Sequence, residues 1–279
     1  SKTDLTALNS EIARAKSSPS YIQNDAAVKA ALAAAEAVAG KPSPSPNEIK
    51  TAVEGLKQAL DNAYKKEADA QAKAQAAVDK AKNSKLPADI QAAENLLNKV
   101  QDAAKKNELQ NVLNGIKQEI TNVRTSLVQL VADAKQVSTD GMTAASANAL
   151  RAGITAAESV IADHGASLGQ LTAAKNALQA ALDGLRADKT SLQKAIHDAE
   201  SEPSYIKNQA SVKQALQEAK VVNAASNPTP AVVRAATKKL NDAVAAAKQS
   251  EAAIQSAALA AVVKAENDKT AQAKNDAQA

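Results

Sequence analysis

The sequence predicts an all-α chain in which three-helix bundles follow one another in tandem. Three observations lead to this fold class. Hydrophobic residues make up 45% of the 279 residues but aromatic residues only 1%, so the apolar content is aliphatic, and Ala, Leu, Lys and Gln favour helices over strands. Apolar residues recur at alternating spacings of three and four between Pro- and Gly-containing breaks. The chain also repeats itself.

The internal repeat has an offset of 184 residues (Pro19 to Pro203) and requires no gap. The hexapeptide Pro-Ser-Tyr-Ile-Gln-Asn at 19–24 returns as Pro-Ser-Tyr-Ile-Lys-Asn at 203–208. The same offset aligns Val78 with Val262. An offset that holds over roughly sixty positions indicates two copies of one structural unit, with other units between them.

Units of roughly 60 residues then divide the chain. The predicted three-helix units are 1–64, 65–122, 123–186 and 187–248, the last repeating the first, while 249–279 is the first helix of a truncated next unit. Three antiparallel helices of about 15–20 residues close a small core, and roughly 60 residues supply three such helices. Because a bundle of this size is marginal alone, we expect neighbouring bundles to share helices.

Breaks rich in Pro, Gly, Ser or other polar residues mark where helices are expected to end. The breaks lie at 17–19, 40–46, Pro87, 105–107, 138–143, 164–165, 202–203 and 227–230. Ser45-Pro46 and Thr229-Pro230 each read as an N-cap followed by proline in the first turn.

Long stretches without a break predict helices that continue from one unit into the next. These stretches are about 46–84, 107–137, 168–200 and 230–275. Shared helices of this length predict a spectrin-like elongated rod. Three charged residues occupy apolar seam positions near the expected boundaries between units. They are Glu67, Asp188 and Glu251. We interpret them as solvated positions where a helix turns a new face to the next bundle, rather than as functional carboxylates.

Composition excludes several classes of function. Absence of Cys excludes a disulfide scaffold, a thiol nucleophile and Cys-based metal sites. The 34 basic and 30 acidic side chains are interspersed and three Tyr are the only aromatic residues, so the charge stripe and stacking platforms of nucleic-acid binders are missing. The apolar runs are too short to span a membrane.

No enzymatic or metal-binding motif stands out. The acidic residues lie among lysines at helical spacings, as solvated helix faces do, and nothing in the sequence converges on His164 or His197. We therefore expect no catalytic residues, no cofactor and no metal.

The Pro-Ser-Tyr-Ile-x-Asn motif is the most distinctive local feature. In a structural interpretation, Pro19 ends the first helix, Tyr21 and Ile22 cover the open end of the bundle, and Asn24 caps the next helix. In a functional interpretation, the tyrosines are exposed anchors for a ligand. The candidate ligand-binding residues are therefore Tyr21, Asn24, Tyr205 and Asn208, although we favour the structural interpretation.

Several segments resemble a known family. Residues 127–185 contain Leu-Val-x-Leu-Val-x-x-Ala-Lys, Ser-Thr-Asp-Gly-Met-Thr and a closing Leu-x-Gly-Leu, and they resemble FIVAR modules of Gram-positive cell-surface proteins. The Pro-Ser-Tyr-Ile-x-Asn units resemble the related Ebh-like repeats of giant extracellular-matrix-binding proteins. Residues 74–117 look like a neighbouring class of helical module. A Tyr common in the first turn of FIVAR modules is Met142 here, so a role for that ring does not carry over.

The resemblance implies a non-enzymatic stalk or adhesin region of an extracellular, cell-wall-anchored bacterial protein. The implied partner is a host extracellular-matrix protein such as fibronectin, with no nucleic acid and no membrane insertion, and the segment would be a monomeric rod within a longer chain. Three alternatives stay open: a dedicated module that binds a serum protein or glycan, accessory repeats of a secreted carbohydrate-active enzyme, and an intracellular tether of the spectrin type.

Overall fold

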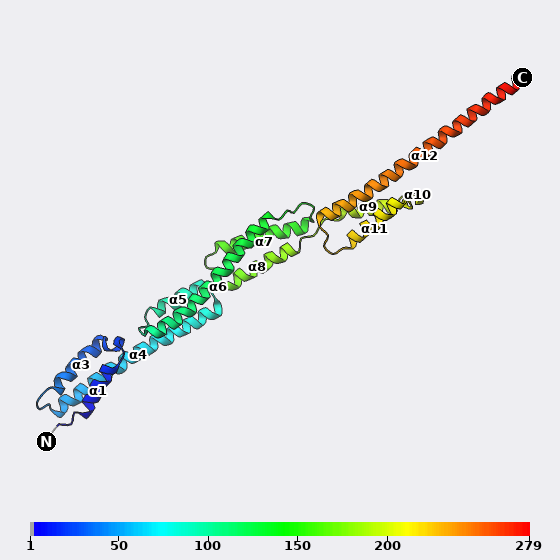
Figure 1. Ribbon diagram of the computed structural model, residues 1–279. Helices are drawn as coiled ribbons and strands as arrows, with labels where there is room; N and C mark the ends of the chain where they lie inside the picture. The colour runs from blue at the N-terminus through cyan, green and yellow to red at the C-terminus, as the bar shows by residue number, and fades with distance from the viewer. Residues whose placement is uncertain (1–2) are drawn as a thin grey trace. The chain divides into compact units, whose positions relative to one another are not determined.

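The computed structural model describes residues 3–279, and within that range it is built from α-helices without a β-strand; one isolated bridge joins Met142 and Ala187. The prediction of an all-α helical-bundle fold is confirmed. The helices, all labelled in Figure 1 except α2, are α1 (Thr6–Ser17), α2 (Ser20–Gln23), α3 (Ala26–Ala39), α4 (Pro46–Ser84), α5 (Pro87–Leu97), α6 (Ala103–Gln136), α7 (Ala144–Ala162), α8 (Leu168–Asp183), α9 (Thr190–Glu200), α10 (Ser204–Lys207), α11 (Ala210–Ala224) and α12 (Pro230–Gln278).

The first bundle consists of α1, α3 and the first half of α4, which pack against one another. Its core is a cluster of aliphatic side chains that includes Leu8, Val28 and Leu56, all fully buried. α4 begins as the sequence predicts, because the Ser45 hydroxyl accepts the Glu48 N–H (3.1 Å) and proline occupies the first turn.

α4 is a single helix of 39 residues that serves two packing partners in turn. Its first half faces α1 and α3, and its second half packs Ala74, Val78 and Ala81 against α5. The helices α6 and α12 also run without interruption through the stretches where continuity was predicted. Three of the four predicted continuous helices therefore form.

The fourth predicted continuous helix, over 168–200, does not form, because α8 ends at Asp183 and α9 begins at Thr190. The intervening backbone pairs with a loop: the Thr143 N–H donates to the Arg186 carbonyl (2.8 Å), and the Asp188 N–H donates to the Gly141 carbonyl (2.7 Å). The prediction was wrong because loop pairing outweighs the apolar periodicity there.

Asp188 lies just before a new helix instead of occupying a seam position within a continuous one. Its carboxylate accepts both the backbone N–H (2.9 Å) and the hydroxyl (2.6 Å) of Thr190, at the start of α9. The break predicted at 105–107 is also misplaced, since these residues lie inside α6. The true turn comes just before, where the Asp102 carboxylate accepts the Lys105 N–H (3.1 Å) as a helix cap.

The last bundle repeats the first with α9, α11 and the beginning of α12. Its core includes Leu192, Ala219 and Leu240, and Ile206 closes one end against Val212 and Ala247. By spatial contact the chain forms two compact units, residues up to Val131 with Ala156–Asn176, and Ala132–Thr155 with Ala177–Ala279. None of the helices within residues 3–279 combines the length and the hydropathy that a membrane span requires.

Candidate functional site

The two Tyr-Ile motifs fold into the same local structure. Each proline is followed by a single helical turn, α2 in the first copy and α10 in the second, and the backbone angles of Pro19 and Pro203 agree to within about 2°. Ile22 and Ile206 are only 1% and 2% exposed and fill the end of their bundles. Isoleucine is therefore the core residue of the motif.

The two asparagines of the motif do not cap the next helix. Asn24 and Asn208 are exposed and have helical backbone angles, and each closes the preceding turn through its backbone N–H. The cap of α3 is Asp25, whose carboxylate accepts two backbone N–H groups at 3.0 and 3.1 Å. The Asn24 cap prediction was wrong because the extra turn places the first extended residue one position later. In the second copy Gln209 takes this position without a side-chain cap.

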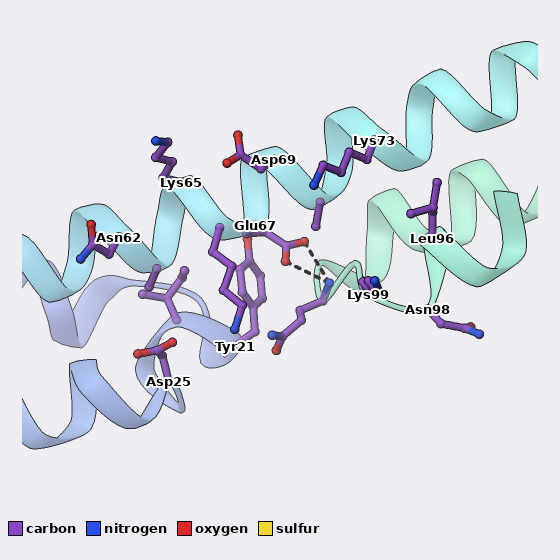
Figure 2. Close-up of a pocket in the computed structure, with 15 residues that line it drawn as sticks. Tyr21, Asp25, Asn62, Lys65, Glu67, Asp69, Lys73, Leu96, Asn98 and Lys99 are labelled. Carbon is purple, nitrogen blue, oxygen red and sulfur yellow. Dashed lines mark hydrogen bonds between the residues drawn. The ribbon is translucent and has the colours of Figure 1, made fainter. Parts of the chain in front are cut away.

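The two tyrosines differ in their surroundings. Tyr21 is half-buried and lines an open cleft of about 800 Å³ in which it lies beside Glu67 (Figure 2), whereas Tyr205 is 56% exposed. Burial, together with the negative charges of Asp102 and Glu67, raises the pKa of Tyr21 above its ordinary value. Since the turns themselves are alike, the difference comes from the residues beyond each turn.

Glu67 is the centre of this cleft and is 6% exposed. Its carboxylate accepts the backbone N–H of Gln101 (2.9 Å), the backbone N–H of Asp102 (3.1 Å) and the side-chain amide of Gln71 (3.2 Å). The dashed lines at Glu67 in Figure 2 mark hydrogen bonds of this carboxylate. Because Asp102 caps α6, the carboxylate of Glu67 joins the middle of α4 to the start of α6. A negative charge is favourable at a helix N-terminus.

This burial corrects the interpretation of Glu67 as a solvated residue. Sequence reasoning placed it correctly at a seam position but missed that the loop before α6 would supply hydrogen-bond donors. The available signals were the glutamine one turn later and the acidic N-cap at Asp102, neither of which identifies Glu67 as their partner.

Several other charged side chains also line the cleft. Lys65, Lys66, Lys73 and Lys99 lie there with Asp69. The cleft lining holds neither Ser, Thr, Cys nor His. Across residues 3–279, no group of three or more His, Cys, Asp or Glu side chains is placed to hold a metal ion.

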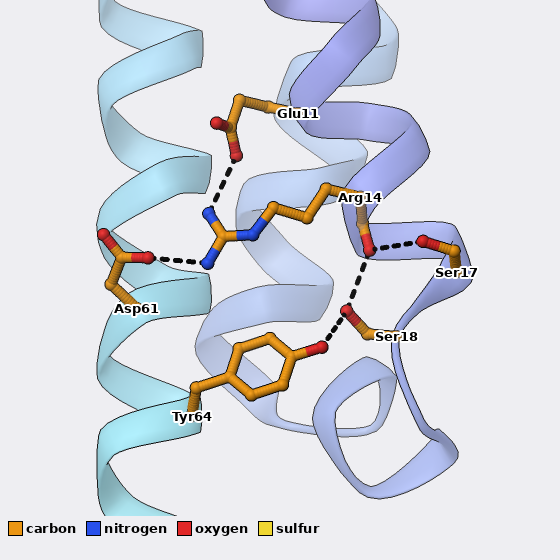
Figure 3. A network of polar contacts seen from close by, with 6 residues as sticks. All are labelled: Glu11, Arg14, Ser17, Ser18, Asp61 and Tyr64. Carbon is orange, nitrogen blue, oxygen red and sulfur yellow. Dashed lines mark hydrogen bonds and ion pairs between the residues drawn. The ribbon is translucent and has the colours of Figure 1, made fainter.

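A second polar cluster joins α1 to α4 near the end of the first bundle (Figure 3). The Arg14 guanidinium donates to Asp61 (2.6 Å) and Glu11 (3.2 Å) and lies 5.8 Å from the centre of the Tyr64 ring. The Tyr64 hydroxyl donates to Ser18 Oγ (2.8 Å), which donates to the Arg14 carbonyl (2.8 Å). The hydrogen bond to Asp61 is the main cause that raises the pKa of Arg14.

The repeat replaces this contact by another between the same positions. At the offset of 184 residues, Ser18 and Tyr64 correspond to Glu202 and Lys248, which form an ion pair at 2.5 Å. Both versions join the end of the first helix of a bundle to its shared helix. The polar clusters at the motif therefore hold helices together, and sequence reasoning identified neither cross-link.

A comparison with protein families matches the FIVAR domain to residues 4–64, 123–186 and 188–248, which together make up more than half of the chain. Neither a curated protein nor a solved structure shows significant similarity to the chain.

Proposed function

Because this chain belongs to the FIVAR domain family, we propose that it is a non-enzymatic stalk segment of a bacterial cell-surface protein. FIVAR domains occur in bacterial surface and cell-wall-associated proteins. In this role the helical units hold an adhesive part of the surface protein away from the cell wall, and they contribute weak contacts to a host extracellular-matrix protein such as fibronectin.

The observation that carries this proposal is the uninterrupted α4. A helix of 39 residues is about 58 Å long at 1.5 Å per residue. A flexible linker of the same length would have a root-mean-square span of only about 35 Å and a broad distribution around it. A spacer built from helices that continue between bundles therefore keeps the length that its sequence supplies.

The surface chemistry supports binding through weak, repeated contacts rather than through a deep binding site. The open cleft beside Tyr21 is lined mainly by Lys, Asp and Asn side chains, and the buried carboxylate in it is already hydrogen-bonded to backbone. Units repeated along one chain raise the avidity of a weak contact through effective concentration.

Spin labels test the stalk directly, because the chain has no Cys and each introduced thiol is unique. Labels at Lys57→Cys and Lys82→Cys lie on α4, on either side of Glu67, and 25 residues of helix separate them by about 38 Å. We expect a narrow distance distribution there. Four glycines inserted after Lys66 serve as the matched control and broaden it. A broad distribution without the insertion would refute the stalk.

Adhesion is tested separately by binding of the full chain to immobilised fibronectin, serum albumin and host glycans. Weak binding to fibronectin that decreases in proportion as units are deleted supports the adhesive contribution. Binding to a serum protein or glycan that is lost completely with one unit would favour the dedicated binding module instead, and absence of any binding at tens of micromolar would leave the stalk alone.

A further inference from the structure

The second half of α12 exposes apolar side chains that have no partner. From residue 252 to the end of α12 every side chain is exposed, although Ile254, Leu259, Val262 and Val263 lie there. These four residues are 48–65% exposed. Large aliphatic side chains this close together on one helix indicate a surface that another element covers.

The internal repeat shows what covers the equivalent surface of α4. At the offset of 184 residues, Val78 corresponds to Val262, Ala74 to Ala258, and Ala70 to Ile254. In α4, Ala74 and Val78 are completely buried, and this half of the helix packs against α5. The face of α12 is at least as apolar as the face of α4, because Ile254 and Leu259 stand where α4 has Ala70 and Gln75.

Glu251 has the same relationship to Glu67. Both carboxylates accept the side-chain amide of the glutamine one turn later at 3.2 Å, from Gln71 in α4 and Gln255 in α12. Glu67 also accepts two backbone N–H groups of the loop between α5 and α6. The tyrosine of the neighbouring turn also differs between the two copies. Tyr21, in the copy of Glu67, is half-buried, whereas Tyr205, in the copy of Glu251, is largely exposed.

We propose that residues 251–266 of α12 form a docking face for an antiparallel helical hairpin of the kind that residues 85–122 form on α4. The hairpin has three recognisable properties. Its first helix turns aliphatic side chains toward α4, as Ile90 and Leu97 do. Its loop presents two backbone N–H groups to the glutamate, and an acidic residue such as Asp102 then caps its second helix.

The chemistry of Glu251 distinguishes a hairpin from a second copy of α12. The backbone N–H groups within a helix are already used, whereas a loop that enters a helix has free ones. A second α12 would cover the aliphatic residues but supply only side chains to a buried carboxylate, and an unpaired buried charge is costly. The Glu-Gln pair that α4 and α12 share therefore favours an occupant with a loop at this position.

The full chain titrated with a separately produced hairpin of residues 85–122 tests this proposal, with hydrogen exchange and calorimetry as readouts. We expect saturable binding and slower amide exchange in residues 251–266. Val262→Asp places a charge on the face and should weaken binding by at least about 100-fold. Val221→Asp is the matched control, because Val221 is an exposed valine of α11 outside this face, and it should change binding less than about threefold.

A covalent version covers the case in which the hairpin does not fold alone. In this fused variant, a second copy of residues 85–122 is appended directly after Asp268. Asp268 corresponds to Ser84, the last residue of α4. We expect the appended segment to become protected from exchange and Tyr205 to become less accessible, with both effects lost in Val262→Asp. An appended segment that exchanges like an unfolded peptide would overturn the proposal. So would a dimer of the full chain that Val262→Asp dissociates, because the occupant would then be a second copy.

Discussion

Replacing Glu67 by alanine should release the start of α6 from α4. The carboxylate is buried and is the acceptor for the backbone N–H groups of Gln101 and Asp102. The alanine side chain offers no acceptor. Both N–H groups therefore lack a partner whenever the loop is packed against α4.

The size of the effect follows from these two groups. A buried donor left without an acceptor costs about 1–3 kcal/mol, and hydrogen bonds to a charged acceptor lie at the upper end. Water entering through the adjoining open cleft recovers part of this cost, so we expect about 3 kcal/mol for the pair. At 1.4 kcal/mol per factor of ten, the local opening of this loop should become about 100-fold more frequent.

Amide hydrogen exchange at Gln101 and Asp102 measures this opening directly, which matters because a chain of several bundles does not unfold in one step. Glu251→Ala is the matched control, since that carboxylate bonds the side chain of Gln255 on its own helix, and it should shift stability by less than about 0.5 kcal/mol. A rise in exchange below threefold at Gln101 and Asp102 in Glu67→Ala, or an equal rise in Glu251→Ala, would refute the reasoning.

Three further outcomes are expected. Gly141→Ala should destabilise its loop by about 2–3 kcal/mol, because φ is +73° and a Cβ there would meet side-chain atoms at 2.7 and 2.8 Å. Gly55 lies inside α4 with open space around it, so Gly55→Ala should stabilise the fold by about 0.5–1 kcal/mol. Thermal melts compare the two variants. Tyr64→Phe should cost about 1 kcal/mol in denaturant unfolding of the first bundle, since one hydrogen bond is lost. The hydrogen bond from Lys220 lowers the pKa of Glu200 below its ordinary value of 4.5. The contribution of this ion pair to stability is therefore present above pH 4.5 and disappears as pH falls through the lower folded-state pKa. The melting temperature of Lys220→Met should lack this acid-dependent step.

Local sequence signals predicted the starts of α4 and α12. Ser45 and Thr229 each accept an N–H three residues later, as their Ser-Pro and Thr-Pro sequences predict. Periodicity also predicted the long α4 and α12. The prediction failed at Gly184, where apolar spacing continued through the sequence but α8 ended, because pairing of residues 186–188 with a distant loop is not encoded in local periodicity.

The candidate site was predictable only in part, for the same reason. The turn at Tyr21 and the buried Ile22 follow from proline and aliphatic spacing. The partners of Glu67 are separated from it by 34 and 35 residues in the chain, and a carboxylate at a seam position has the same local pattern whether water or backbone surrounds it. Only the course of the loop before α6 distinguishes the two.

The two repeats use different polar contacts between the first helix and the shared helix, so in each bundle these two helices are complementary to each other. Ser18 and Tyr64 form a neutral contact in one copy, and Glu202 and Lys248 form an ion pair in the other. A misfolded bundle that combined the first helix of one copy with the shared helix of the other would set Glu202 against a tyrosine hydroxyl and Lys248 against a serine. Neither charge would then find its counter-ion. Chains of near-identical bundles are prone to such mispairing while they fold, and divergence at this polar position protects the correct partner of each helix where the common aliphatic core does not.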